Sequence, residues 1–245
     1  ATGGDAKITT GDLALEINTS SVGGTLTVNA GNSITQKGST SITVEGSTAV
    51  TITASAGPTV TLTQNNNNFK GAVSIINGNQ MRLDTSGALV IGTITGAWAV
   101  LESSGDVTQS ADGTFDLSNF FSVDARSADE NTFYDVTLTN PGSETTRIKN
   151  IFAKNFSYLD SATSGTLSVG GNVTDGTQVT ENFTLTTRRP IDDYEHELLV
   201  GGTTTITARN EAGTTNYNIV LDSVGADDEH NFAIVPRDDS TSRAQ

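Results

Sequence analysis

The sequence predicts an all-β protein: a single-stranded parallel β-helix, or β-solenoid, in which one chain winds into stacked coils. Three observations predict this fold. Short apolar segments alternate with Thr and Ser at period two along most of the 245 residues. No segment of a dozen residues carries the apolar spacing of an amphipathic helix, and only residues 117–125 are ambiguous. Degenerate phrases recur at intervals far longer than one coil, which is typical of a stacked array.

The expected strands follow one another from the N-terminus with short gaps. Their Val, Ile, Leu and Thr residues suit a half-buried pleated strand, and the gaps are rich in Gly, Asn and Ser, which supply turns. The expected strands cover residues 13–17, 25–28, 41–44, 50–53, 60–63, 87–94, 98–101, 115–117, 133–138, 145–148, 167–169, 183–186, 197–200, 203–207 and 217–221. A solenoid needs only one inward apolar row per strand, so a hydrophobic fraction of 34% is sufficient.

Two repeated phrases are interleaved along the chain. The first occupies residues 24–36, 99–109 and 165–174, and the second occupies residues 67–75 and 131–138, with a fainter copy at 216–221. The displacement of the first phrase is 109 − 36 = 73 residues, from Gln36 to Gln109, and that of the second is 133 − 69 = 64, from Phe69 to Phe133. Coils of about 20 residues would place roughly a dozen coils in the chain, which would form a rod on the order of 60 Å long.

An immunoglobulin-like sandwich is the main alternative, since it also has a strand about every 8–12 residues. A sandwich does not predict internal self-similarity and usually has a more aromatic core. The run of four Asn at residues 65–68 suits a solenoid corner, where an Asn side chain can bond to the same residue type one coil away. These features favour the solenoid.

The charge density rises from about Ser127 onward. We interpret the charged clusters as longer loops that leave the rod. The predicted organisation is therefore regular coils over residues 1–125, less regular coils with longer charged loops over 126–235, and a polar tail over 236–245.

The net charge of −15 argues against nucleic acid and anionic membranes as partners, because both require clustered Lys and Arg. There is no Cys, which excludes disulfides, thiolate metal ligands and thiol catalysis. No run approaches the roughly 18 apolar residues of a membrane-spanning helix, so no membrane insertion is expected. The chain begins with Ala1 and is expected to be a processed or excised piece of an exported protein.

Three stretches in the first half of the chain share a pattern with a known family. They are GTLTVNAGNSITQ at residues 24–36, NNFKGAVSI at 67–75 and MRLDTSGALVIG at 81–92. In this order they resemble the repeats of very large bacterial surface adhesins of the filamentous haemagglutinin type, mainly over residues 12–110. The resemblance implies a right-handed parallel β-helix, exported to the bacterial cell surface, that works in adhesion, aggregation or building a biofilm matrix. It supplies no catalytic residues.

Both histidines lie in acidic clusters. His196 follows Asp192, Asp193 and Glu195, and His230 ends the run at residues 227–230. Neither cluster has the H-E-x-x-H spacing of a zinc site, and we interpret both as solvated loops. The functional alternative is a calcium site made by Asp192, Asp193 and Glu195, because all three supply hard oxygen ligands. No other cofactor is expected.

Parallel β-helices also serve as polysaccharide lyases, in which Asp residues hold Ca²⁺ and an Arg or Lys removes a proton. Arg188 and Arg189, with Asp192 and Asp193, are the candidates for that role. Paired carboxylates of a glycoside hydrolase would be invisible in the sequence, since their separation of about 5–9 Å depends on the fold. A secreted polysaccharide-active β-helix enzyme, lyase or hydrolase, is therefore the alternative function.

Two further surface functions are alternatives. Repeated Thr-x-Thr pairs occur on ice-binding faces, but their irregular spacing here favours ordinary outward strand positions. Aromatic side chains in the middle of the chain would form either a sugar-stacking platform or part of the core, and the core is the preferred interpretation. These residues are Trp98, Phe120, Phe121, Phe133, Tyr134, Phe152, Phe156 and Tyr158.

Together these features predict a non-enzymatic, extracellular structural or adhesive β-solenoid, either a cell-surface adhesin or a matrix filament. The open ends of a solenoid invite pairing with another chain, and residues 1–10 show no obvious cap. End-to-end assembly into fibres is therefore expected, with copies of the chain or neighbouring repeats of a larger chain as partners. A cell-surface carbohydrate or protein is the other expected partner.

Overall fold

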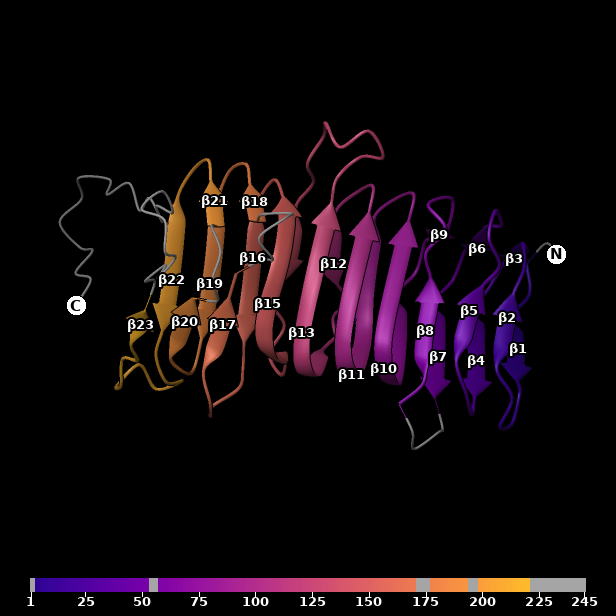
Figure 1. Ribbon diagram of the computed structural model, residues 1–245, viewed down its shortest axis with the longest axis horizontal. Coiled ribbons are helices and arrows are strands. Elements are labelled where there is room, and N and C mark those ends of the chain that lie inside the picture. Colours follow the sequence, from indigo (N-terminus) through magenta and orange to yellow (C-terminus); the bar gives the residue numbers. More distant parts are fainter. Residues whose placement is uncertain (1–2, 53–56, 171–176, 194–197, 221–245) are drawn as a thin grey trace, which may run out of the picture.

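The chain folds as a parallel β-solenoid of about nine turns, which confirms the predicted fold class (Figure 1). The computed structural model describes residues 3–52, 57–170, 177–193 and 198–220. These residues contain strands, turns and bends but no helix. Residues 117–125, for which the pattern was ambiguous, form a strand. The predicted tail at 236–245 lies outside the described residues.

The described residues form twenty-three strands that follow one another along the rod. They are β1 (Ala6–Thr9), β2 (Leu15–Ile17), β3 (Ser20–Val22), β4 (Leu26–Ala30), β5 (Ile34–Gln36), β6 (Ile42–Val44), β7 (Thr48–Ile52), β8 (Thr59–Leu62), β9 (Asn68–Phe69), β10 (Val73–Thr85), β11 (Leu89–Ser103), β12 (Val107–Gln109), β13 (Phe115–Ala125), β14 (Val136–Leu138), β15 (Glu144–Ala153), β16 (Phe156–Asp160), β17 (Leu167–Val169), β18 (Thr177–Val179), β19 (Phe183–Thr187), β20 (Ile191–Asp193), β21 (Leu198–Val200), β22 (Thr204–Ala208) and β23 (Ile219–Val220).

Every ladder between these strands is parallel, and each strand pairs with its equivalent one coil away. Coil length varies widely. Met81 pairs with Ala99, eighteen residues later, whereas Ile191 pairs with Ile219, twenty-eight residues later. The expectation of a dozen coils of about twenty residues is therefore wrong, because the longer coils carry loops that leave the rod.

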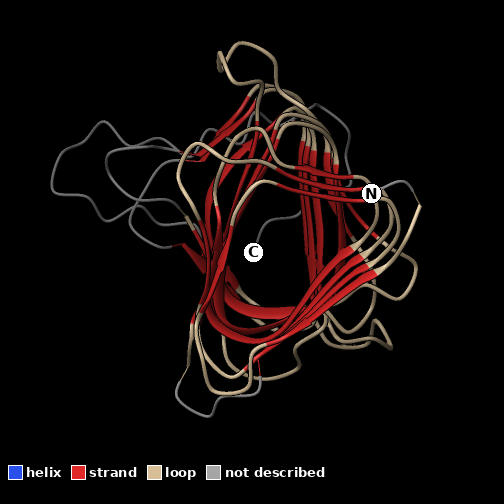
Figure 2. Ribbon diagram, turned by 90° about the vertical axis from the view of Figure 1, so that its right-hand side faces the viewer, coloured by secondary structure: helices blue, strands red, loops and turns tan. Residues whose placement is uncertain are grey.

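The strands surround the interior of the rod (Figure 2). Buried apolar side chains form one hydrophobic core along it. One inward row runs through consecutive coils as Ile34, Val60, Met81, Ala99, Phe121 and Ile148, all fully buried. The strand register places each of these side chains over the equivalent position of the neighbouring coil. Burying one large aliphatic or aromatic side chain contributes about 1.5–3 kcal/mol. Stacking therefore stabilises a narrow core that no isolated coil could form.

Two glycines allow the long strands β10 and β11 to bend together. Gly78 and Gly96 are register partners at a point where the ladder shifts. A Cβ atom on Gly96 would overlap the carbonyl oxygen of Gly78. The strands expected at residues 87–94 and 98–101 are therefore one bent strand, because glycine lets the backbone turn the corner without a break.

The second repeated phrase does not mark equivalent positions. Phe69 is buried in the ladder of β3, β6 and β9. Phe133 lies before β14, in a loop, where it forms an isolated antiparallel bridge with Arg126. The strand expected at residues 133–138 begins at Val136, since the preceding residues belong to a protruding loop.

The run of Asn at residues 65–68 has one buried member, Asn67, and it does not form the expected asparagine ladder. Asn67 is fully buried, but its side chain pairs with Gln36 instead of another Asn. An Asn–Asn bond between coils does occur further along, where Asn182 Nδ2 donates to Asn155 Oδ1 at 2.9 Å. Both arrangements place amide groups at the corners, where strand ladders end and backbone groups need partners.

Candidate functional site

The outward positions of β10, β11, β13 and β15 form parallel rows along the rod. In-register stacking places equivalent side chains on successive coils about 4.8 Å apart. The rows are Gln80–Trp98–Phe120–Arg147, Arg82–Val100–Ser122 and Asp84–Glu102–Asp124–Phe152. An aromatic row and an acidic row therefore lie on one face, separated by a mixed row.

The aromatic row is a closed stack. The Trp98 and Phe120 rings lie 5.4 Å apart between centroids at an interplanar angle of 8°. Arg82, from the strand on one side, places its guanidinium carbon 5.3 Å from the centroid of the Trp98 ring. Lys149, from the strand on the other side, places Nζ 4.7 Å from the Phe120 centroid. Each ring therefore lies against the other ring and against a cation.

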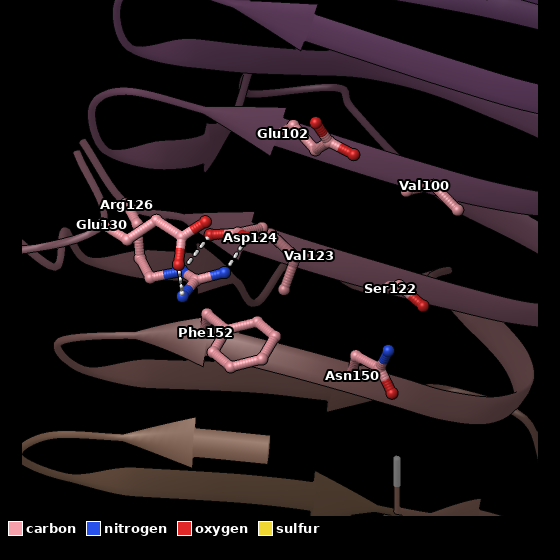
Figure 3. Close-up of a pocket in the computed structure, with 9 residues that line it drawn as sticks. All are labelled: Val100, Glu102, Ser122, Val123, Asp124, Arg126, Glu130, Asn150 and Phe152. Carbon is pink, nitrogen blue, oxygen red and sulfur yellow. Dashed lines mark hydrogen bonds and ion pairs between the residues drawn. The ribbon is translucent and has the colours of Figure 1, made fainter. Parts of the chain in front are cut away.

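Beside this stack lies a groove of about 440 Å³ that is open to solvent (Figure 3). Its lining residues come from three successive coils and from the loop after β13. They are Val100, Glu102, Ser122, Val123, Asp124, Arg126, Glu130, Asn150 and Phe152. The groove therefore crosses β11, β13 and β15 along the axis of the rod.

Arg126 anchors one end of the groove. Its Nε and Nη2 atoms donate to the two carboxylate oxygens of Asp124 at 2.8 and 2.5 Å, and Nη1 donates to Glu130 at 3.2 Å. The guanidinium carbon also lies 3.9 Å from the Phe152 ring centroid. The bonds to Asp124 are the main reason that the pKa of Arg126 is raised above its ordinary value. The arginine is thus held in one position by charge and by stacking.

The loop between Arg126 and Phe133 forms the wall of the groove and stands above the strand ends in Figure 1. Ser127 N donates to Thr132 O at 2.8 Å. The Ser127 hydroxyl donates to Asp129 at 2.5 Å, and hydrogen bonds from Ser127 and Asn131 lower the pKa of Asp129 to about 2. The loop is therefore an ordered turn with fixed charges.

Carboxylates crowd the groove. Partial desolvation raises the pKa of Glu102, and repulsion from Asp84 and Asp124 raises it further against the attraction of nearby arginines. Desolvation and Asp124 likewise raise the pKa of Asp84. Glu102 forms no hydrogen bond or ion pair with any described residue. The lining holds three carboxylates and one guanidinium, so it is net negative.

The structure reaches only part of the predicted calcium site. Asp192 is exposed on β20, Asp193 ends that strand without a described side chain, and Glu195 lies outside the described residues. Both histidines also lie outside them. In the part of the chain that is described, no group of three or more His, Cys, Asp or Glu side chains is arranged to hold a metal ion. The calcium site stays a prediction.

Arg189 does not have the environment of a lyase base. Its side chain is 4% exposed and donates through Nε and Nη2 to the buried carboxylate of Asp160 at 2.8 and 2.9 Å. It also donates to the carbonyl oxygens of Thr145 and Ser164. Arg188 instead pairs with Glu211 at 3.1 Å. The buried ion pair with Asp160 therefore argues against Arg189 as the base, and the enzyme alternative stays a prediction.

The aromatic residues divide between the core and the surface. Phe121, Phe156 and Tyr158 are buried, as the core interpretation predicted, whereas Trp98, Phe120 and Phe152 are partly exposed on the outer face. The signal was present in the sequence. Residues 99 and 101 are apolar inward positions, so period-two alternation turns residues 98, 100 and 102 outward.

The repeats in the sequence coincide with a known family of repeats. A family model described as "Repeats of unknown function (DUF5649)" matches residues 3–76 and again residues 78–155. Neither the curated proteins nor the solved structures gave a significant match. Within the described ranges, no helix is long and apolar enough to cross a membrane. The groove lies in the second matched unit.

Proposed function

The chain belongs to the family of repeats of unknown function (DUF5649), and from that premise we propose that it is a non-enzymatic adhesive or structural solenoid of the cell exterior. It would work as a surface adhesin or as a matrix filament. The three stretches of sequence that resemble large bacterial adhesins lie within the two matched units. An elongated repeat suits this role because it displays side chains at a distance from the surface that carries it.

The observation that carries the proposal is the continuous stack of coils, tied at its corners by side chains that reach the next coil. Asp106 accepts a hydrogen bond from the backbone N–H of Asp135 at 3.0 Å. Asn155 accepts one from the N–H of Asn182 at 3.0 Å, and Asn182 accepts one from the N–H of Thr203 at 3.1 Å. These bonds link coils that strand ladders alone would leave free to splay at the corners, which favours a rigid rod.

The first coil supplies a surface for self-association. Among the described residues, β1, β2 and β3 each pair on one side only, with β4, β5 and β6. A preceding repeat or a second copy of the chain can continue these ladders by the same parallel pairing. Contacts of this head-to-tail kind do not close on themselves and generate filaments.

A display experiment tests the adhesive role. The full chain is anchored on a non-adherent bacterium, and cell settling and attachment to surfaces are measured against cells that display an unrelated soluble β-sandwich. We expect faster settling or stronger attachment with the solenoid. Equal behaviour of the two cell lines would contradict an adhesive role.

The filament and enzyme alternatives need separate measurements. Electron microscopy of the pure chain should show uniform fibres, and a chain without residues 1–20 should lose them. Unchanged fibres after the deletion would contradict assembly through the first coil.

Release of reducing or unsaturated ends from a polysaccharide panel, abolished in Asp192→Ala, would overturn the non-enzymatic proposal in favour of a β-helix enzyme.

A further inference from the structure

We infer that the groove across β11, β13 and β15 binds an extended oligosaccharide that carries no acidic groups. The inference deepens the proposed adhesive function and rests on it, because it names the ligand class that the exposed face would hold. It starts from the groove as a whole, in which apolar, donor and acceptor groups from three coils and one loop converge (Figure 3).

The form of the groove suits a chain more than a compact molecule. It is open to solvent and takes its lining from three successive coils, with Val100 on β11, Ser122 on β13 and Asn150 on β15. Equivalent positions repeat about every 4.8 Å along the rod. An extended glycan laid along the axis of the rod would therefore place successive sugar rings over successive coils. A chain of several rings can therefore contact all three coils at once.

The lining groups match the chemistry of sugar rings. The Glu102 carboxylate makes no hydrogen bond or ion pair with a described residue, although Arg82 and Arg126 attract it, and it can accept two hydroxyl hydrogens. Arg126 uses three of its N–H groups on Asp124 and Glu130, which leaves donors for ring or hydroxyl oxygens. Val100 and the edge of Phe152 supply apolar contact for the C–H faces of a ring. The site therefore offers acceptors, donors and apolar surface within one groove.

The charge of the groove selects among glycans. Glu102, Asp124, Glu130 and the neighbouring Asp84 outnumber the two arginines that act on Glu102, Arg126 and Arg82. An acidic polysaccharide would meet like charge without enough counter-ions. A neutral sugar meets no such cost, and a protonated amino sugar gains a charge-assisted hydrogen bond at Glu102. The expected order of affinity is amino, then neutral, then acidic oligosaccharides.

The groove is ordered before any ligand arrives. Arg126 is fixed by Asp124, Glu130 and the Phe152 ring, and the wall loop is closed by bonds between Ser127 and Thr132. Binding would immobilise few side chains, which lowers the entropic cost of association. Loops inserted into a regular solenoid also gather on one face, which is often the binding face.

The test is titration of the full chain with matched hexasaccharides, followed by calorimetry and by the fluorescence of Trp98, the single tryptophan. The panel holds β-linked glucose, N-acetylglucosamine, glucosamine and galacturonic acid hexamers, with hexalysine as a peptide cation. We expect saturable binding of the first three, strongest for the glucosamine hexamer, and none for the galacturonate. Preference for the galacturonate, no binding of any sugar, or equal binding of hexalysine and the glucosamine hexamer would overturn the inference.

Variants locate the binding in the groove. Glu102→Gln should weaken binding of the glucosamine hexamer by about tenfold, because it removes one charge-assisted bond. Ser122→Tyr, which fills the middle of the groove, should abolish binding of every sugar. Glu16→Gln is the matched control, since Glu16 is also an exposed outward Glu on a strand, β2, far from the groove. Circular dichroism verifies that each variant is folded, and unchanged binding in both groove variants would place the sugar elsewhere and overturn the inference.

The two proposals fail separately. Cells that display the chain and adhere, while the pure protein binds no sugar, would overturn the glycan site and leave the adhesive role intact. Sugar binding that is lost in Ser122→Tyr, without any adhesion by the displayed chain, would support the site and contradict the adhesive role.

Discussion

The side chains of Gln36 and Asn67 hydrogen-bond to each other twice across neighbouring coils. Gln36 Nε2 donates to Asn67 Oδ1 at 2.7 Å, and Asn67 Nδ2 donates to Gln36 Oε1 at 2.8 Å. The same spacing of 31 residues returns in the second matched unit, where the N–H of Asn140 donates to Gln109 Oε1 at 2.9 Å. The Gln that ends the first repeated phrase is thus a link between coils.

Asn67→Ala should destabilise the N-terminal half of the rod. Asn67 is fully buried, and its Oδ1 also accepts from the backbone N–H of Ile42 at 2.9 Å. Alanine would leave that N–H and the Gln36 amide without these partners, and an unsatisfied buried polar group costs about 1–3 kcal/mol. Urea unfolding followed by circular dichroism measures the loss.

Asn66→Ala is the control for this substitution, because Asn66 belongs to the same run but is exposed. Its effect should stay within about 0.5 kcal/mol. Equal effects of the two alanine variants would show that the Gln36–Asn67 pair adds no stability.

Arg189→Leu should be among the most destabilising single changes in the C-terminal half. The substitution leaves the fully buried Asp160 carboxylate without its counter-ion, and breaking a buried pair in this way costs about 3–5 kcal/mol. Asp160→Leu should cost a similar amount, whereas the double Leu variant should lose much less than the sum. Thermal unfolding of the three variants measures the coupling between Asp160 and Arg189. A stability loss in the double variant equal to the sum of the two single losses would contradict this coupling.

How much of the structure can be predicted from the sequence depends on how far apart along the chain the interacting residues lie. Alternation is local, so the inward row and the outward positions of Trp98 and Glu102 can be read within one strand. The groove needs residues from three coils in register. Because coil length varies from eighteen to twenty-nine residues, no fixed period places Glu102 beside Asp124. The ion pair between Asp160 and Arg189, 29 residues apart, cannot be predicted from the sequence for the same reason.

The repeated phrases show the same limit. The 73-residue displacement of Gln36 and Gln109 does mark structurally related corners, because each Gln bonds to an Asn 31 residues further on. The 64-residue displacement of Phe69 and Phe133 does not, since a loop inserted after β13 places Phe133 outside the core. Self-similarity therefore predicted the solenoid but not which copies are equivalent.

Gly96→Ala should disrupt the bend shared by β10 and β11. The new methyl group would overlap the carbonyl oxygen of Gly78, a backbone atom held in the parallel ladder. Overpacking of this kind costs about 1–3 kcal/mol or more. Gly87→Ala is the control, because its Cβ would meet no atom within 4 Å, and it should be neutral or stabilising by up to about 1 kcal/mol. A Gly96→Ala variant with the same melting temperature as the wild type would contradict the close approach of Gly96 to the Gly78 carbonyl oxygen.

Glu102→Gln should stabilise the protein near neutral pH and not in acid. The pKa of Glu102 is raised in the folded chain above its ordinary value of 4.5, so just above that pH the folded state binds more protons than the unfolded state. Stability then falls as the pH rises through this window, and the ionised carboxylate lowers stability above it. Below this pH range Glu102 is protonated in both the folded and the unfolded state, so it no longer lowers the stability. The variant lacks this titration at every pH.

The expected gain at pH 7 is small, within about 0.5 kcal/mol, because Glu102 is exposed. Melting curves of the wild type and Glu102→Gln at pH 7 and pH 3.5 measure it, with Glu16→Gln as the control at a site away from Asp84 and Asp124. A gain for Glu102→Gln that is as large at pH 3.5 as at pH 7 would show that charge crowding is not its cause. A gain confined to pH 7 would show that the groove holds excess negative charge, the property on which its preference for neutral and amino sugars depends.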